Sequence, residues 1–279
     1  MKAEQIIEHI TQWLGDYLKK SKQKGFIIGV SGGIDSALSS LLAARSGAPL
    51  IALELPICQK KEQLKRSKEH IDFLKKKFPS QVEHLRIDLS SIYKSFYQKA
   101  FHNSYLKKED LFFKKLKINP SSSNQQLALV NTKARLRMCL LYYYASLFNY
   151  LVVGTGNKIE DFGVGFFTKY GDGAVDISPI ADLTKTQVRT LAKVLDIPLS
   201  IQKATPTDGL WEDDRSDEEQ LGASYEELEW AMEKIQEGKS NQCFKEREKE
   251  LIDKYTLLHE KNFHKINPIP VCKIPKKLL

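Results

Sequence analysis

The amino-acid sequence predicts an α/β fold, a doubly wound parallel sheet flanked by helices, with helical additions at its C-terminal end. Short apolar runs alternate with longer helical patterns over the first two hundred residues, which is typical of parallel strands joined by crossover helices. Neither an internal repeat nor a linker interrupts the 279 residues. We therefore expect one domain over 1–279, with its core at about 25–200 and the additions at about 201–279.

Four short runs of branched and apolar residues are predicted to be the strands. Strands of a parallel sheet are covered on both faces, so they read as nearly continuous apolar segments. The runs lie at 25–30, 49–55, 82–89 and 150–154.

Helices are expected between these runs, at 35–46, 60–77 and 123–149. The last of them opens with Ser123-x-x-Gln126, a capping-box pattern. Its second half, 138–145, is apolar or aromatic on nearly every face, and a helix of that kind is buried. Burial in the core of one chain and burial at a subunit interface are both compatible with this pattern.

Capping boxes also mark the helices that follow the predicted sheet. Thr184-x-x-Gln187 precedes an apolar stripe with helical spacing, so a helix is expected to begin there. The patterns at 216–219 and 224–227 predict two more helices in the C-terminal additions.

Composition narrows the class of protein further. No apolar run approaches the ~20 residues that a membrane span needs, and the N-terminus lacks the apolar core of a signal peptide. The four cysteines lie far apart without a CxxC pair, which argues against a disulfide framework or a structural zinc. We therefore expect a cytoplasmic protein with no membrane partner.

The chain is basic, with 43 basic against 35 acidic side chains, and the excess is concentrated in two segments. Residues 60–77 and 94–117 each carry a net charge of +5. Such runs are typical of solvated helix faces, but they also suit an anionic partner, either a nucleotide or a nucleic acid. Charge alone leaves these possibilities open.

A predicted phosphate loop joins the first strand to the following helix. Two adjacent glycines allow its backbone amides to approach an anion, and the helix behind adds its positive N-terminal end. Two serines add hydroxyl donors, while an aspartate among these donors makes sense if Mg²⁺ bridges it to phosphate. The loop residues are Gly29, Val30, Ser31, Gly32, Gly33, Ile34, Asp35 and Ser36.

This loop resembles the pyrophosphate loop of the adenine-nucleotide alpha-hydrolase superfamily, and the motifs after it resemble those of the NAD synthetases. They occur in order over about 25–272. They depart from the family at Asp208-Gly209, where Ala-Asp is usual. The motifs are ARLRM at 134–138, GTGNKIE at 154–160, GFFTKYGD at 165–172 with Asp176, DLTKT at 182–186, PTDGLW at 206–211 and HK at 264–265.

The resemblance implies ATP-dependent amidation of nicotinic acid adenine dinucleotide (deamido-NAD) to NAD, through an adenylylated intermediate. AMP and pyrophosphate are the other products. Only about 25 residues precede the first strand, too few for an amidase domain, so free ammonia is the expected nitrogen donor. The sequence does not decide whether a separate glutaminase supplies that ammonia. The family's habit, together with helix 123–149, predicts a homodimer.

The resemblance also assigns the ATP and metal sites. Asp35 and Glu160 are expected to hold Mg²⁺, although Asp161 could take the place of Glu160. Thr155, Lys185 and Thr207 are expected to contact ATP beside the phosphate loop. Lys185 has independent support, because a cation in the first turn of a helix opposes the helix dipole and suggests a nearby phosphate.

The remaining assignments concern the dinucleotide and the chemistry. Asp35, Asp176 and Lys185 are the predicted catalytic residues, with Asp176 orienting or deprotonating the incoming ammonium. The residues expected to bind deamido-NAD are Arg137, Lys169, Asp176, His264 and Lys265.

Two other functions compete with this interpretation. A tRNA-modifying adenylylase, such as a lysidine synthetase, would suit the loop and the basic segments but leaves the motifs after residue 130 unexplained. A nucleotide-binding module without catalysis would have no need for Asp35, Glu160 and Lys185 together. We therefore expect ATP, deamido-NAD and ammonia as ligands, and no nucleic acid.

Overall fold

Four parallel strands form the central sheet of the computed structural model, in the order β3-β2-β1-β4. The structure describes residues 1–101, 122–211, 213, 215–238 and 244–278, so most of the second basic segment and Cys243 lie outside the described residues. The strands are β1 (Gly25–Gly29), β2 (Leu50–Glu54), β3 (Val82–Arg86) and β4 (Tyr150–Val152).

Alternate side chains of β1 enter different cores, because successive residues of a strand point to opposite faces. Phe26 and Ile28 pack into one cluster, and Ile27 packs into the other. The four predicted runs are therefore confirmed as strands, and β1 and β2 are covered on both faces as expected. Strand β3 lies at the edge of the sheet, and its Glu83, Leu85 and Arg86 are exposed, so burial on both faces is wrong for this strand.

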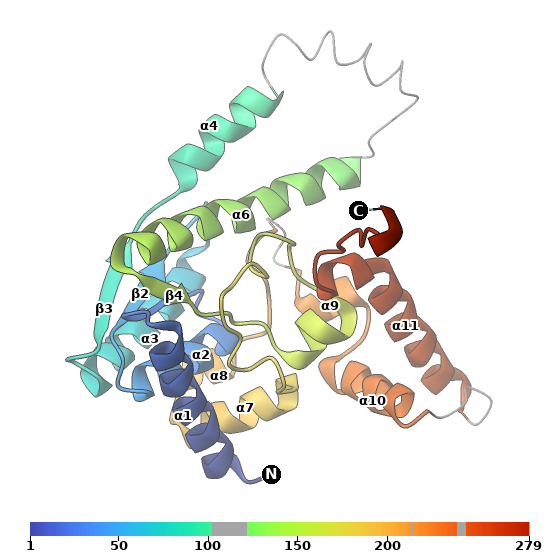
Figure 1. Cartoon of the computed structure of the whole chain (residues 1–279), viewed down its shortest axis with the longest axis horizontal. Coiled ribbons are helices and arrows are strands. Elements are labelled where there is room, and N and C mark those ends of the chain that lie inside the picture. Colours follow the sequence, from blue (N-terminus) through green and yellow to red (C-terminus); the bar gives the residue numbers. More distant parts are fainter. Residues whose placement is uncertain (102–121, 212, 214, 239–243, 279) are drawn as a thin grey trace.

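One face of the sheet is covered by helices from both halves of the chain (Figure 1). Their apolar side chains form the larger core with one face of β1, β2 and β3. The helices are α1 (Ala3–Ser21), α2 (Ile34–Arg45), α3 (Lys61–Lys77), α7 (Lys185–Val194) and α8 (Leu199–Gln202).

The other face is covered by α6 (Ser122–Phe148), which packs Met138, Leu141 and Ala145 against the sheet. Its outer face carries Tyr143 and Leu147, which are 59% and 57% exposed. Segment 138–145 is therefore buried on one face only within the chain, because Cys139 and Tyr143 on the opposite face are exposed. Burial of that outer face at a subunit interface stays a prediction. Helix α4 (Ser90–Phe101) contacts α6.

The C-terminal helices build a separate core around a π-helix, η1 (Lys158–Val164). Ile159 and Val164 of η1 are buried among apolar side chains of this helical region. Its helices are α9 (Asp217–Leu221), α10 (Tyr225–Gln236) and α11 (Glu246–Ile266); a short 3-10 helix, η3 (Lys276–Leu278), follows near the end of the chain.

Several element boundaries differ from the sequence prediction. The third and fourth strands end at Arg86 and Val152, earlier than expected, although single backbone hydrogen bonds from Ile87 and Val153 to the neighbouring strands continue beyond these ends. Helix α6 begins at Ser122, so Ser123 lies inside its first turn and is not the predicted cap. The capping boxes at 184–187, 216–219 and 224–227 are confirmed. Among the described helices, none is long and apolar enough to cross a membrane.

Candidate active site

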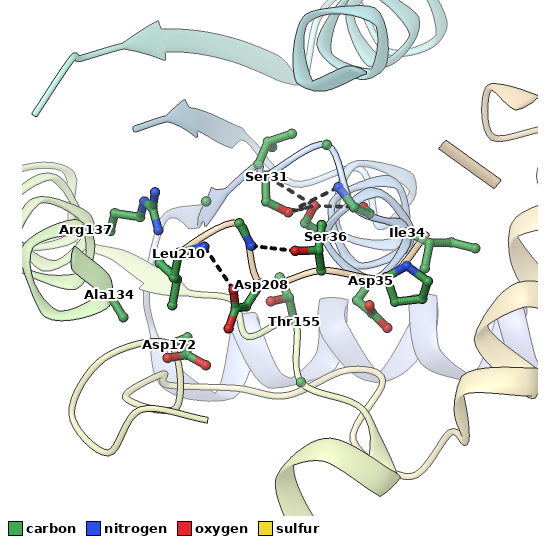
Figure 2. A pocket seen from close by; sticks show the side chains of 18 of the residues that line it. Ser31, Ile34, Asp35, Ser36, Ala134, Arg137, Thr155, Asp172, Asp208 and Leu210 are labelled. Carbon is green, nitrogen blue, oxygen red and sulfur yellow. Dashed lines mark hydrogen bonds between the residues drawn. The ribbon is translucent and has the colours of Figure 1, made fainter. Parts of the chain in front are cut away.

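The predicted phosphate loop leaves β1 at the carboxyl end of the sheet and turns into α2 (Figure 2). Its two serines hold each other, because the Ser31 and Ser36 Oγ atoms are 3.0 Å apart. The Gly33 amide donates to Ser31 Oγ at 3.2 Å, and the Ser36 hydroxyl donates to the Gly33 carbonyl at 3.0 Å. These bonds fix the shape of the loop in advance of any ligand.

Gly32 is required at the tip of this loop for two physical reasons. Its φ of +80° lies in the left-handed region, which is unfavourable for residues that carry a Cβ. A Cβ on Gly32 would also lie 2.8 Å from the Ser67 amide nitrogen and 2.9 Å from the Gln63 carbonyl oxygen. The loop therefore packs closely on helix α3.

The loop faces a cavity of about 260 Å³ that lies between the sheet, α6 and the segment 204–210. Figure 2 shows Ser31, Asp35 and Ser36 around one part of the cavity and Arg137 and Asp172 around another. All eight predicted loop residues line it. So do five further predicted residues, namely Arg137, Thr155, Glu160, Lys185 and Thr207.

Three charges meet beside the loop, a buried lysine and two half-buried carboxylates. The Lys185 Nζ donates to Asp35 Oδ2 at 2.6 Å and to Glu160 Oε1 at 2.9 Å. The lysine side chain is only 2% exposed. Asn157 Nδ2 also donates to Asp35 Oδ1 at 3.2 Å. The sequence placed these three ionisable residues in one site, and the structure brings them into direct contact.

The pKa values of this triad follow from burial and charge. Burial favours the neutral acid and raises the pKa of Asp35, even though Lys185 opposes that rise. Burial would also raise the pKa of Glu160, but Lys185 and the Tyr225 hydroxyl outweigh it, and the pKa is lowered. The pKa of Lys185 is raised, because the two carboxylates outweigh the effect of its burial.

Lys185 is the first residue of α7, after the Thr184 cap. A cation at this position opposes the helix dipole, and the sequence argument inferred a nearby anion from that cost. The anions that lie there in the structure are the carboxylates of Asp35 and Glu160. The protein itself thus supplies negative charge at this position, and the predicted contact of Lys185 with phosphate stays a prediction.

Glu160 and its neighbour Asp161 are held by the π-helix η1, which Asn157 caps through its side-chain oxygen. Glu160 shares Lys185 with Asp35, whereas Asp161 has no such shared contact among the described residues. Burial and the charge of Glu160 raise the pKa of Asp161 well above its ordinary value. This geometry favours Glu160 over Asp161 as the partner of Asp35, and its metal role stays a prediction.

Several acidic and phenolic residues of the site were not predicted from the sequence. Asp172, Asp208 and Asp217 line the cavity, and the Tyr225 hydroxyl donates to Glu160 Oε1. Burial raises the pKa of Asp217 to about 7. Its helix was located by a capping box and Asp217-Glu218 resembles a family motif, but an acid in the first turn of a helix is ordinarily solvated, so the helical pattern gave no sign that Asp217 faces the cavity. Asp172 stood in a quoted motif without an assigned role.

The predicted dinucleotide residues fall into separate places. Arg137 lines the cavity, donates from Nε to the Leu55 carbonyl at 3.0 Å, and has a pKa lowered to about 10 by burial. Asp176 lies outside the cavity lining, where it accepts bonds from the Tyr142 hydroxyl and the Val152 amide at 3.1 and 2.8 Å.

Lys169, His264 and Lys265 meet where α11 ends beside 163–169. The Lys169 ammonium donates to the His264 carbonyl. The Lys265 ammonium donates to the Phe167 carbonyl at 2.8 Å. The structure thus brings three of the predicted residues together, although none of the three lines the cavity.

This arrangement can hold both an anion and a cation. Backbone amides at a glycine-rich turn and helix N-terminus suit phosphate. The two carboxylates on one ammonium show that Asp35 and Glu160 can face a single positive centre. The site therefore suits a phosphorylated substrate whose negative charge is balanced by a cation.

Comparison with known proteins gives consistent matches. The chain matches the NAD synthase family over residues 6–269. It is 35% identical over 230 residues to the NH(3)-dependent NAD(+) synthetase of Mesoplasma florum, covering 82% of this chain and 84% of that one.

Two solved structures share the fold over nearly the full chain. NMN synthetase from Francisella tularensis is 30% identical with a TM-score of 0.78, covering 99% of each chain. The NH3-dependent NAD synthetase from Campylobacter jejuni, in complex with the nitrate ion, is 25% identical with a TM-score of 0.73. This chain is covered to 98% and that one to 100%.

Proposed function

This chain belongs to the NAD synthase family, and from that we infer that it amidates deamido-NAD to NAD with ATP and ammonia. It is a ligase that forms a carbon–nitrogen bond. The observation that carries this conclusion is one cavity in which the glycine-rich loop of 29–36 faces the buried Lys185, Asp35 and Glu160. The related NH(3)-dependent NAD(+) synthetases support the same reaction.

The reaction proceeds in two displacements. A nicotinate carboxylate oxygen attacks the α-phosphorus of ATP, the bond from that phosphorus to the bridging oxygen breaks, and pyrophosphate leaves with the electron pair. Ammonia then attacks the acyl carbon, loses a proton, and expels AMP, which keeps the oxygen that came from the carboxylate. Activation is needed because oxide is too poor a leaving group for direct amidation.

Each group of the chain has a positional task in the first displacement. The amides and serine hydroxyls of the loop hold the β- and γ-phosphates, and Lys185 balances charge on the phosphates that move. Thr155 and Thr207 line the same cavity and would contact the rest of ATP. The loop is already held in shape by its internal hydrogen bonds, so little reorganisation is needed.

Asp35 and Glu160 would hold Mg²⁺. The residues fit this ion, because two carboxylate oxygens already converge on one cationic atom and ATP phosphates can supply further hard oxygen ligands. The pKa of Asp35 is raised chiefly by burial, and the charge of Glu160 adds to the rise against the effect of Lys185. When bound, Mg²⁺ neutralises phosphate charge that grows as pyrophosphate departs.

The dinucleotide would be gripped at two places. Arg137 lies in the cavity with a buried Nη2 that has no hydrogen-bond partner among the described residues, so it can take a phosphate or carboxylate. The second place is the group of Lys169, His264 and Lys265, which lies outside the cavity lining. Asp176, which lies behind the cavity lining, would act on ammonium only if the nicotinate end reaches it.

We further propose that the protein acts as a homodimer in the cytoplasm. The apolar outer face of α6 supports the dimer, because contiguous exposed apolar side chains mark interaction surfaces. Cys58, Cys139 and Cys272 are free thiols, which supports a reducing compartment.

A second candidate substrate is nicotinic acid mononucleotide, which would give NMN. One observation favours it: the TM-score and identity to the Francisella tularensis NMN synthetase exceed those to the Campylobacter jejuni enzyme. The two candidates share all the adenylylation chemistry. They differ in whether the AMP half of the dinucleotide must be bound as well.

The proposal is tested by incubating the chain with ATP, Mg²⁺ and deamido-NAD, with either ammonium or glutamine in ammonia-free buffer. We expect NAD, AMP and pyrophosphate in equal amounts with ammonium, and no NAD with glutamine. Parallel reactions with nicotinic acid mononucleotide give the ratio of kcat/KM for the two acids. A ratio in favour of the mononucleotide would replace the first candidate with the second.

A further inference from the structure

We propose that Arg66 of α3 binds the pyrophosphate end of ATP, as a residue of the site beyond those already described. This inference rests on the proposed function only for the identity of ATP as the substrate. It comes from four observations: the helix face on which Arg66 lies, its contact with the phosphate loop, the unpaired state of its guanidinium, and the local balance of charge.

Arg66 belongs to a polar stripe on the side of α3 that faces the cavity. Gln59, Gln63 and Arg66 all line that cavity. Gln63 and Arg66 are three residues apart in α3, so they lie on the same face of the helix. Gln59, four residues before Gln63, precedes the helix on the same side. Lys65 and Lys68, the basic neighbours of Arg66 on the same helix, are exposed and do not line the cavity.

The root of Arg66 lies against the tip of the phosphate loop. A Cβ added to Gly32 would stand 3.1 Å from the Arg66 Cβ. The residues on either side of the contact, Gln63 and Ser67, approach Gly32 with their backbone atoms. A side chain that starts at the loop and ends in the cavity can reach whatever the loop amides hold.

The guanidinium of Arg66 has capacity for a ligand. Its Nε is buried and has no hydrogen-bond partner among the described residues. The described part of the chain also gives it no salt bridge within 4.0 Å, whereas Lys185 is engaged by two carboxylates. An unpaired donor that is removed from water is costly, and a phosphate oxygen would satisfy it.

The position of the phosphate loop indicates which phosphates of ATP Arg66 would contact. The β- and γ-phosphates lie on the loop amides in the proposed pose, and Arg66 adjoins the loop at its tip. Charge accumulates on these phosphates as the bond to the α-phosphorus breaks. A planar guanidinium can donate hydrogen bonds to two phosphate oxygens at once. Arg66 should therefore strengthen the binding of ATP and pyrophosphate and leave the affinity for AMP unchanged.

Calorimetric titration of the full chain in Mg²⁺ tests this inference with three probes: ATP, inorganic pyrophosphate and AMP. For Arg66→Gln we expect affinity for ATP and pyrophosphate to fall by about 10- to 100-fold, the effect of losing a charged hydrogen bond, with AMP affinity unchanged. Lys68→Gln removes the same charge from the exposed side of α3, and its affinities should stay within about twofold of wild type, the scale of screened surface charge. Arg66→Lys should recover part of the loss.

Two results would overturn the inference. If Arg66→Gln binds pyrophosphate as tightly as wild type does, Arg66 does not contact the pyrophosphate end of ATP. If its affinity for AMP falls as much as its affinity for ATP, Arg66 contacts another part of the nucleotide. The melting temperature of each variant shows whether it is folded. If Arg66→Gln does not fold, the affinities of Arg66→Lys for ATP, pyrophosphate and AMP are compared with those of the wild type in its place. If the wild-type chain binds ATP but forms no NAD, the proposed function fails while the binding data still decide the role of Arg66.

Discussion

At the scale of single residues, the site is governed by an excess of buried negative charge. Lys185 satisfies both Asp35 and Glu160, so the three residues together carry one more acid than base. Asp217 lies close enough for the same charges to affect its pKa. A buried set of this kind is stabilised by a further cation, which is the physical reason to expect Mg²⁺ and a triphosphate to bind together.

Asp35→Asn should leave the fold intact and disable adenylylation. The variant keeps a balanced Lys185–Glu160 pair, so the melting temperature should stay near that of wild type. Pyrophosphate release at saturating substrates should fall by roughly 10²–10³, the usual effect of losing one preorganised charge contact in a transition state. Asp16→Asn, on the exposed face of α1, is the matched control. Normal melting with near wild-type pyrophosphate release would show that Asp35 is not the metal ligand.

Asp217→Asn should stabilise the protein at alkaline pH. The pKa of Asp217 is about 7 in the fold against an ordinary 3.8, so the folded state holds a proton that the unfolded state releases between these values. The stability that this proton contributes is present below pH 4 and is lost as pH rises through 7. The gain in melting temperature from the substitution should therefore be larger at pH 8.5 than at pH 5. Asp72→Asn, on exposed α3 surface, should show no such pH dependence, and an equal gain at both pH values for Asp217→Asn would refute the argument.

The sequence could locate residues whose type was unusual for their position. Lys185 was found because a lysine opposes the dipole at a helix start, and the loop was found because its glycines and serines cluster after a strand. Tyr225 and Asp217 could not be found in this way. A tyrosine or an aspartate in the first turn of a helix is ordinary, and only the packing of α9 and α10 against η1 turns them toward Glu160.

At the scale of elements, local rules worked where the interactions are local. The capping boxes of α7, α9 and α10 were predictable because each is closed within four residues. The π-helix η1 was not predictable, because its wider turn is fixed by distant contacts: Asn262 and His259 of α11 bond to the carbonyls of Val164 and Gly163. Its bulge is what carries Glu160 to Lys185.

One face of helix α6 packs against the sheet, and its outer face is predicted to pack against a second copy of the chain in a homodimer. Leu147→Glu places a charge on that face, where Leu147 is 57% exposed. Light scattering at micromolar concentration should give a dimer for the wild type and a monomer for this variant. Leu199→Glu on α8 alters another exposed leucine on a different surface, and it should remain a dimer. A wild-type monomer with full activity, or a dimeric Leu147→Glu, would exclude this interface.

At the scale of the whole molecule, the sheet brings distant motifs together. Parallel strands all end at one edge, so the loops after β1, β2 and β4 meet there, and Thr155, Asp35 and Leu55 line one cavity. This much followed from the α/β pattern. The closure of the cavity by segment 204–210 did not, because it depends on long-range contacts such as the bond from the Lys133 ammonium to the Leu210 carbonyl at 2.7 Å. The single-domain assignment over 1–279 stays a prediction.

The most direct test of the central claim follows oxygen from the substrate carboxylate. The chain is supplied with ATP, Mg²⁺, ammonium and deamido-NAD in which both nicotinate carboxylate oxygens are ¹⁸O, and the masses of the products are measured by mass spectrometry. The account predicts NAD with one labelled oxygen in its amide and AMP with one labelled oxygen in its phosphate, in equal amounts, with unlabelled pyrophosphate. NAD formation without label in AMP would contradict adenylylation of the carboxylate, and the absence of NAD would contradict the assigned reaction.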